Sequence, residues 1–116
     1  MLDVLATFTA LAEPNRFRIV ELLRQGPRPV NDIKDALRLQ QPQVSKHLRV
    51  LKEAGLVEVQ PRAQQRLYEL RAEPLLALHQ WLEGYRQLWD ERFNEMDELL
   101  AELNEKEKKD VRKKRR

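Results

Sequence analysis

The sequence predicts a mainly α-helical fold that contains one small β-hairpin and ends in a long helix. Apolar residues recur at helical spacing in five segments of the chain. Two short runs, LVEV (56–59) and RLYEL (66–70), alternate apolar and polar residues and are rich in β-forming residues. The chain has 116 residues, of which 41% are hydrophobic and three are glycine, and this suits one globular domain.

The first three helices are placed by their apolar residues and by proline and glycine. Residues 2–12 carry apolar side chains at helical spacing. A second helix begins at Pro14, because proline lacks the N–H that has no partner in a first turn, and it stops at Gly26. A third, short helix begins at Pro29 or Asn31, and the side chains expected to face inward are Val30, Ile33, Ala36 and Leu37.

The fourth helix and the hairpin follow directly. The helix begins near Gln41 and ends at Gly55, and its apolar residues at i, i+4 and i+7 share one face: Val44, Leu48 and Leu51. The two alternating runs after Gly55 predict two antiparallel strands. Residues 60–65 between them are expected to form an exposed polar tip.

The last helix is the longest element. It opens at Pro74, and its apolar residues follow at spacings of three and four, close to a heptad: Leu75, Leu78, Leu82, Tyr85, Trp89, Phe93, Met96, Leu100 and Leu103. As one straight helix, residues 74–104 would measure about 46 Å. The other elements are too small to cover this stripe, which predicts self-association. We therefore expect one domain with dimerisation helices over 1–104 and a basic, disordered or fraying tail over 105–116.

Charge is segregated along the chain. The net charge of +3 comprises +4 over residues 28–71, −6 over 72–104 and +5 over 105–116. A basic middle segment points to a polyanionic partner, and the acidic segment beside it is unsuited to the same contact. The basic tail either is solvated or adds nonspecific affinity for DNA.

The order of elements is that of a helix-turn-helix followed by a β-wing. Helices three and four are joined by a tight connection at Leu39 and Gln40, and the basic charge lies there and in the hairpin. With the apolar face of the fourth helix turned inward, Gln43, Lys46 and Arg49 point outward, with Ser45 and His47 on the flanks. Glutamine and arginine can bond to base edges, and lysine and serine suit phosphates.

These segments resemble a known family. The run LQQPQVSKHLRVLKEAGLVEV (39–59), followed by RLYEL (66–70), resembles the winged helix-turn-helix of the ArsR family of bacterial and archaeal repressors. LAEPNRFRIVELL (11–23) is similar to the second helix of that family, and LLALHQWLEGYRQLWDERF (75–93) resembles its metal-independent, SdpR-like branch. The resemblance implies homodimers formed by the first and last helices and an inverted-repeat operator near the protein's own promoter.

Two sets of functional residues follow. The expected DNA contacts are Gln41, Gln43, Ser45, Lys46, His47, Arg49, Arg62 and Arg66. For His47 the alternative is packing against the preceding helix, and for the two hairpin arginines it is solubility of an exposed tip. The expected dimer interface comprises Leu5, Phe8, Leu78, Leu82, Tyr85, Trp89, Phe93 and Met96.

The chain departs from the family pattern at the turn and at the wing tip. Arg38 stands where the family commonly has glycine, which predicts a left-handed residue that is not glycine, at a cost of about 1 kcal/mol. Gln40 stands where serine is common and is a weaker N-cap. The wing tip offers Ala63 and Gln64 in place of the usual glycine.

Several classes of site are not expected. The chain has no cysteine, so thiolate metal sites and disulfides are excluded, and His79 is the sole histidine of the long helix. We therefore expect no metal and no cofactor. No nucleophile–base pair, phosphate-binding glycine loop or paired carboxylates indicate an enzyme. No signal peptide or membrane span is evident, so we expect a cytoplasmic protein.

The leading hypothesis is a homodimeric repressor that binds double-stranded DNA, with an inducer or partner protein left open. The alternative is an adaptor or antitoxin-like module that uses the long helix to bind another protein. An RNA-binding winged helix ranks last, because the predicted strands lack exposed aromatic residues for base stacking.

Overall fold

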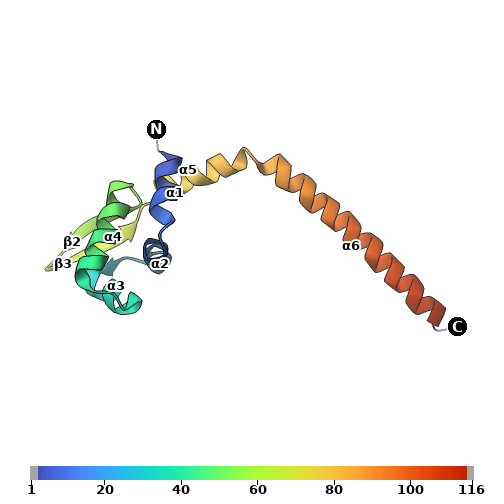
Figure 1. Cartoon of the computed structure of the whole chain (residues 1–116), viewed down its shortest axis with the longest axis horizontal. Coiled ribbons are helices and arrows are strands. Elements are labelled where there is room, and N and C mark those ends of the chain that lie inside the picture. Colours follow the sequence, from blue (N-terminus) through green and yellow to red (C-terminus); the bar gives the residue numbers. More distant parts are fainter. Residues whose placement is uncertain (1–2, 115–116) are drawn as a thin grey trace. The chain divides into compact units, whose positions relative to one another are not determined.

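The computed structural model describes residues 3–114, which form helices α1 to α6 and strands β1 to β3 (Figure 1). The chain divides into two compact units, residues 1–81 and residues 82–116. The first unit holds the sheet and the helices packed on it, and the second holds α6. Each unit is described by itself.

Helices α1 and α2 begin at capped residues. α1 spans Val4–Leu11, and the Asp3 carboxylate before it accepts a hydrogen bond from the Leu5 N–H at 3.0 Å. α2 spans Pro14–Leu23, and Glu13 Oε2 accepts from the Arg16 N–H at 2.8 Å. Both predicted helices are confirmed, including proline in the first turn of α2. Leu2, expected in the first helix, lies outside the described residues.

Helices α3 (Val30–Leu37) and α4 (Gln41–Glu53) are joined by the predicted tight turn. Arg38 ends α3 with φ 56° and ψ 44°, which confirms a left-handed residue other than glycine at this position. Ile33 and Leu37 are buried, whereas Ala36 is exposed, so its predicted inward position is wrong. Ala36 lies roughly 80° around the helix from the centre of the buried face.

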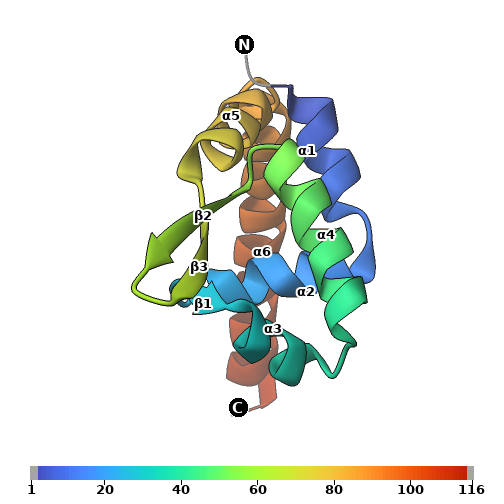
Figure 2. The ribbon, with the colours of Figure 1, turned by 90° about the vertical axis from the view of Figure 1, so that its left-hand side faces the viewer.

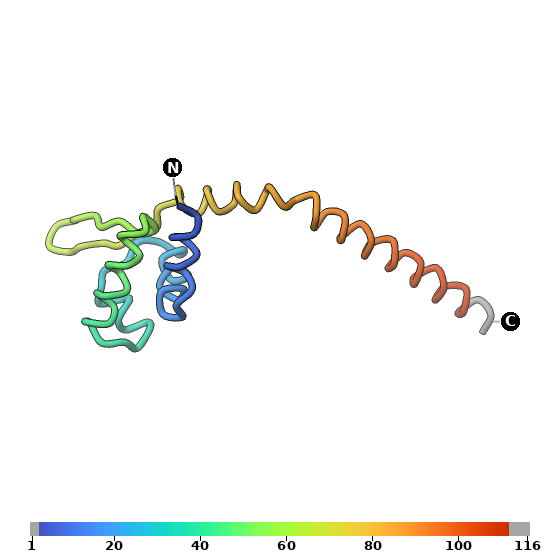
Figure 3. Tube along the Cα trace, turned by 45° about the horizontal axis from the view of Figure 1, so that its top comes forward, coloured from blue at the N-terminus to red at the C-terminus, as the bar shows by residue number. Residues whose placement is uncertain are grey.

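The sheet has three strands in the order β1-β3-β2, all antiparallel. The hairpin consists of β2 (Val57–Arg62) and β3 (Gln65–Leu70), so the turn is Ala63 and Gln64, and the predicted six-residue tip is wrong. Pro61 fits because β2 is an edge strand, and Ala63 turns the chain with φ 55°. β1 (Arg28–Pro29) pairs with β3 and was not predicted. Figure 3 shows the hairpin projecting as a narrow loop.

One core holds the first unit together, with α2, α3, α4 and the hairpin arranged around it (Figure 2). Its apolar members come from every helix from α1 to α4 and from the start of the hairpin: Ala10, Ile19, Val20, Leu23, Ile33, Leu37, Val44, Leu48, Leu51, Leu56 and Val57. The three predicted inward residues of the fourth helix are therefore confirmed. α4 is fixed by this core, so its opposite face has a defined position.

The long terminal helix is interrupted. α5 spans Ala72–Glu83 and α6 spans Arg86–Lys114, so the single helix predicted over 74–104 is wrong. Gly84 and Tyr85 form a turn in which the Tyr85 N–H donates to the Leu82 carbonyl at 2.9 Å. Glycine costs roughly 1 kcal/mol in a helix interior relative to alanine, which favours the break here.

The basic tail also differs from expectation. α6 continues to Lys114, where fraying or disorder was predicted, and residues 115–116 lie outside the described residues. Glu–Lys pairs at i,i+4, such as Glu102 with Lys106 and Glu105 with Lys109, favour helix in this segment. Within residues 3–114, no helix combines the length and the apolar character needed to cross a bilayer.

Candidate nucleic-acid interface

Helix α4 presents a polar face opposite its buried one. Val44, Leu48 and Leu51 are buried in the core. On the other side the polar residues expected to contact DNA are all exposed: Gln41, Gln43, Ser45, Lys46 and Arg49. The separation of faces arises from the 3.6-residue period, and the core holds the polar face in place. We call α4 the recognition helix from here on.

The hairpin β2–β3, which we call the wing, also has two different faces. Strand pairing places Tyr68 opposite Val59, and Arg66 opposite Pro61. Because side chains alternate across a strand, these four residues share one face, whereas Arg62 lies on the other. The two arginines expected to contact DNA therefore project from opposite faces of the wing.

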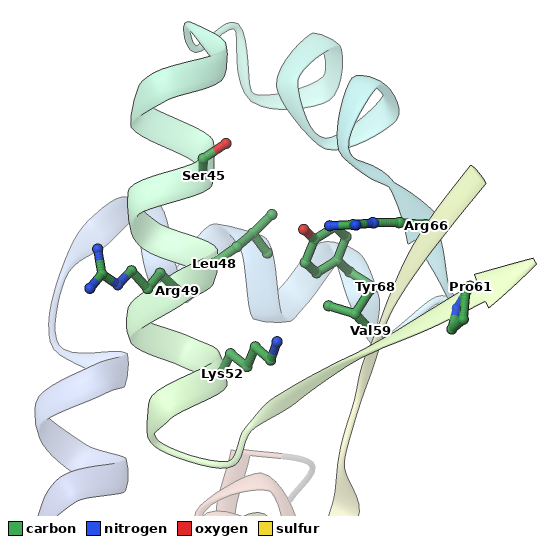
Figure 4. Close-up of a pocket in the computed structure, with 8 residues that line it drawn as sticks. All are labelled: Ser45, Leu48, Arg49, Lys52, Val59, Pro61, Arg66 and Tyr68. Carbon is green, nitrogen blue, oxygen red and sulfur yellow. The ribbon is translucent and has the colours of Figure 1, made fainter. Parts of the chain in front are cut away.

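A groove lies between the recognition helix and the inner face of the wing (Figure 4). Its volume is about 450 Å³, and it is lined by Ser45, Leu48, Arg49, Lys52, Val59, Pro61, Arg66 and Tyr68. The Ser45 hydroxyl, the Lys52 amine and the Arg66 guanidinium point into it, as does the Tyr68 hydroxyl. Two cations and two hydroxyls thus converge over an apolar floor. Hydrogen-bond donors of this kind match phosphate oxygens.

Arg49 takes a different direction from its neighbours. Its guanidinium points away from the wing in Figure 4, and its Nε lies 3.4 Å from Glu53 Oε1, one helical turn on. Both side chains are largely exposed, so the pair is weak and its arginine can be redirected.

A second pocket continues this surface toward the wing tip. It has a volume of about 530 Å³ and is lined by the starts of α3 and α4 together with the wing: Pro29, Val30, Asn31, Asp32, Gln41, Ser45, Gln64, Gln65, Arg66 and Tyr68. Ser45, Arg66 and Tyr68 line both pockets. A continuous concave surface therefore runs from α3 across the recognition helix to the wing.

Gln43 has a local partner at the start of the recognition helix. Its side-chain Oε1 accepts a hydrogen bond from the Gln40 N–H at 3.1 Å, which satisfies one of the backbone donors preceding the helix. The expected weakness of Gln40 as an N-cap is thus offset by Gln43. The Gln43 amide NH₂ group is the part of this side chain suited to a base edge.

The side chain of His47, a residue of α4, is directed toward the start of α2. Its side chain is 15% exposed, and its Nδ1 is 3.6 Å from Glu13 Oε2. Nδ1 is buried and has no hydrogen-bond partner among the described residues. This position favours the alternative reading, packing against a preceding helix, over contact with a phosphate.

The outer face of the wing carries two facing carboxylates together with Arg62. Glu58 and Glu69 are opposite each other across the strands. A hydrogen bond to Glu58 raises the pKa of Glu69, and partial burial and the negative charge of Glu58 act in the same direction. Arg71 lies 3.8 Å from Glu58 and 3.5 Å from Glu73. The pKa of Glu73 is lowered because its carboxylate accepts a hydrogen bond from the Glu73 backbone N–H, and the nearby Arg71 lowers this pKa further.

Two residues of the groove, Lys52 and Tyr68, were not predicted from the sequence. Both carried a signal: Lys52 is seven residues after Ser45, on the same side of the helix, and Tyr68 is two residues after Arg66 on the same strand face. Their convergence depends on how the wing folds back beside the helix.

The expected interface residues lie in both units. In the first unit Leu5 is 72% exposed, Phe8 is exposed and Leu78 is half-buried. In the second unit Trp89 is half-buried, and the others are exposed: Leu82, Tyr85, Phe93 and Met96. No cluster of three or more His, Asp or Glu side chains suited to a metal ion occurs within the described part of the chain.

A recognition helix packed behind a short turn and flanked by a β-wing defines a winged helix-turn-helix protein of the DNA-binding class. The model for bacterial regulatory proteins of the arsR family matches residues 13–59. The chain is 42% identical over 89 residues to the HTH-type transcriptional regulator Rv2034 of Mycobacterium tuberculosis, covering 70% of this chain and 83% of Rv2034. This protein belongs to the ArsR family and is a DNA-binding transcription regulator.

Other similar proteins agree with this assignment. The chain is 47% identical over 55 residues to the regulator NmtR of Mycobacterium tuberculosis, covering 47% of this chain and 46% of NmtR. It therefore spans about half the length of that relative. The homodimeric winged helix-turn-helix DNA-binding domain of Mb0332 from Mycobacterium bovis is 32% identical, with a TM-score of 0.59 over 71% of this chain and 79% of that domain.

Proposed function

We propose that this protein is a homodimeric transcriptional repressor that binds an inverted-repeat operator through the recognition helix and the inner face of the wing. The groove in which Lys52 and Arg66 converge with Ser45 and Tyr68 carries this proposal. Its cations and hydroxyls suit the sugar–phosphate backbone, and the exposed amides at the start of α4 suit base edges.

Each part of this surface has a separate role. Gln41, Gln43 and Ser45 occupy the first turns of the recognition helix, where such helices meet base edges. Lys46, Arg49 and Arg66, with Lys52, contact phosphates, and Arg62 contacts the backbone from the other face of the wing. In a symmetric dimer the two recognition helices enter successive major grooves about 34 Å apart, so the operator is an inverted repeat.

Dimerisation involves the exposed apolar residues of α1, α5 and α6. Leu5 and Phe8 on α1 are exposed, as are Leu82 and Tyr85 near the end of α5. Several large apolar side chains that are exposed to water favour burial in an interface. The homodimeric Mb0332 domain supports the same assembly for this chain.

We also propose that regulation does not use a thiolate metal site, as expected for the SdpR-like branch that the sequence resembles. The chain contains no cysteine, and a closed metal site needs three or four converging ligands. Calorimetry with zinc, nickel and cobalt tests it: we expect no stoichiometric site tighter than micromolar and no effect of chelators on DNA affinity. Tight binding that releases DNA would overturn it.

A mobility-shift assay with the DNA upstream of the coding region tests the central proposal. We expect retention of a fragment that contains an inverted repeat and no retention of a scrambled fragment at about 150 mM salt. If Gln43→Ala, Lys46→Ala and Arg66→Ala all left affinity for that fragment unchanged, the proposed contacts would be wrong.

The second candidate function is a protein–protein adaptor or antitoxin-like module. The apolar residues exposed along α6, including Phe93, Met96 and Leu100, favour it. An adaptor of this kind would lose partner binding on substitution in α6 and would show no preference for any DNA sequence. A sequence-specific shift in the assay above would exclude this function as the main one.

A further inference from the structure

A polar contact on the flank of the recognition helix joins it to the start of α2. His47 of the recognition helix places Nδ1 3.6 Å from Glu13 Oε2, and both side chains are at least partly buried. Nδ1 itself is buried, and within residues 3–114 it has no hydrogen-bond partner. Buried nitrogens of this kind are satisfied in most proteins, and a displacement of about half an ångström would bring Nδ1 within hydrogen-bond distance of the carboxylate.

Glu13 is a fixed base for this contact. Its Oε2 atom accepts a hydrogen bond from the Arg16 N–H at 2.8 Å and so caps α2, and the Phe17 N–H donates to the Glu13 carbonyl at 2.9 Å. The Arg16 guanidinium ties this end of α2 to the end of α1, because it donates to the Ala10 carbonyl at 2.7 Å and to the Thr9 carbonyl at 3.2 Å. A carboxylate held in this way fixes the direction of a group that bonds to it.

The carboxylate also favours one protonation pattern of the imidazole. A carboxylate accepts hydrogen bonds and donates none, so it favours the forms of His47 in which Nδ1 bears a proton. In the neutral form with its proton on Nδ1, Nε2 has no proton to donate to a DNA phosphate. The position of His47 therefore suits a bond within the protein better than a phosphate contact.

The place of His47 on the recognition helix links this contact to base readout. His47 follows Gln43 by four residues, so the two side chains lie on the same side of α4, one turn apart. The apolar face of α4 is held by core burial, which is a non-directional effect. A hydrogen bond restricts both a distance and an angle. A bond from His47 to Glu13 therefore limits the rotation of α4 about its axis and, with it, the direction of Gln43.

We propose that His47 is a positioning residue, whose Nδ1–H donates to Glu13 Oε2 and holds the recognition helix at the rotation in which its first turns read base edges. This inference rests on the proposed mode of DNA binding and adds a determinant of sequence selectivity that touches no nucleotide. Base readout depends on the direction of side chains, whereas attraction to phosphates depends mainly on charge. Loss of the bond therefore reduces the preference for operator over random DNA and leaves affinity for random DNA unchanged.

Substitutions of His47 in the full chain test this role. His47→Leu replaces the imidazole by an apolar side chain, and we expect the ratio of operator affinity to random-DNA affinity to fall roughly tenfold, through loss of one hydrogen bond to a charged group. His47→Asn keeps an N–H at the position of Nδ1, so it should recover most of this ratio. The probes are the upstream fragment that contains the inverted repeat and a scrambled fragment of equal length. Thermal unfolding identifies a temperature at which every variant is folded, and affinities are compared there.

Glu13 provides the matching test from the other side of the contact. Glu13→Asp keeps a capping carboxylate for α2, since aspartate is a favoured N-cap, but its side chain is one methylene too short to reach His47. We expect the same loss of selectivity as in His47→Leu, and no further loss when the two substitutions are combined. Glu21→Asp shortens another glutamate of α2, which is exposed and pairs with Arg24, so it is the matched control and should leave selectivity unchanged.

The outcomes separate this inference from the proposed function. If the unsubstituted protein shows no preference for the inverted repeat, the proposed function is wrong and the positioning role falls with it. If that preference exists and His47→Leu retains it, the positioning role alone is wrong. Equal weakening on both fragments with a lower salt slope would show that His47 contacts a phosphate. Additive losses in the double variant would show that the two side chains act separately. Either of these results overturns the proposed bond.

Discussion

The rings of Phe8 in α1 and Trp81 in α5 meet edge to face, with centroids 5.3 Å apart and planes at 81°. Such aromatic pairs contribute about 0.5–1.5 kcal/mol beyond the area that they bury. This contact joins the first helix to the helix before the break, and both rings remain partly exposed. The pair therefore holds together the two elements expected to dimerise while still presenting apolar surface.

The dimer should depend on apolar residues near and after the break. Leu82→Glu combined with Trp89→Glu places two charges on the apolar stripe, and we expect a monomer or aggregate in analytical sedimentation because buried carboxylates are costly. Gln87→Glu with Asn94→Glu adds the same charge at exposed positions off the stripe and should remain dimeric. A stable dimer from the first variant would contradict the assigned interface.

Gln43 should contribute to both folding and DNA binding. Gln43→Ala removes the acceptor for the Gln40 N–H, with a loss of roughly 0.5–1 kcal/mol in the free energy of unfolding. It should also cost about 1–3 kcal/mol at the operator and relax base preference. Gln43→Glu keeps a capping oxygen but replaces the amide donor by a carboxylate, so thermal stability should persist while operator affinity falls. Equal operator affinity in all three proteins would exclude base contact by this side chain.

The groove cations should act on the DNA backbone. Lys52→Ala and Arg66→Ala should each weaken binding to operator and random DNA alike and reduce the salt slope by about one unit. Arg24→Ala is the control, because Arg24 lines neither pocket and pairs with Glu21 at 3.8 Å. The measurement is DNA affinity over a series of salt concentrations. A loss confined to the operator would mean that these residues read bases instead.

The left-handed residue between α3 and α4 should be a source of strain. Arg38→Gly removes the Cβ that disfavours φ 56°, so we expect a gain of up to about 1 kcal/mol in the free energy of unfolding, measured in urea. Lys34→Gly, within α3, should instead lose about 1 kcal/mol. Destabilisation by Arg38→Gly would show that contacts of the arginine outweigh the strain.

The outer face of the wing should show opposite pH effects at two glutamates. The pKa of Glu69 is raised in the folded state, so the folded chain holds this proton more tightly than the unfolded chain does. The free energy of unfolding therefore falls as pH rises from the ordinary pKa of a glutamate through the raised pKa. Glu69→Gln should therefore increase the unfolding temperature near pH 7 and lose this advantage in acid. The pKa of Glu73 is lowered, so Glu73→Gln should decrease stability near pH 7, with the difference vanishing as pH falls through the folded pKa. The same sign for both variants would contradict these assignments.

Most of the fold could be predicted because its elements have local causes. The 3.6-residue apolar period placed α1 to α4, proline marked the start of α2, and Gly55 marked the end of α4. The exposed face of the recognition helix followed from its buried one. Strand β1 was missed because two residues carry no period and exist as a strand through pairing with β3.

The candidate site was predicted less completely. The residues of α4 that were predicted to face solvent are exposed in the structure, apart from the partly buried His47. The side chain of His47 is directed toward Glu13, and that of Arg49 toward Glu53. Lys52 and Tyr68 join the site because the wing lies beside the recognition helix. The residue pattern of a single strand or helix does not specify how far apart the wing and the recognition helix lie.

The sequence by itself determined the order of elements, the two faces of the recognition helix and the left-handed turn at Arg38, because each depends on residues within a few positions of one another. The tertiary structure decided which cations converge, the two-residue wing turn and the division of the terminal helix at Gly84. The first two features depend on strand pairing and on the packing of the wing beside the recognition helix, whereas the break at Gly84 is closed by a local turn in which the Tyr85 N–H donates to the Leu82 carbonyl. Local propensity is too weak to decide them, since its differences are about 1 kcal/mol or less per residue.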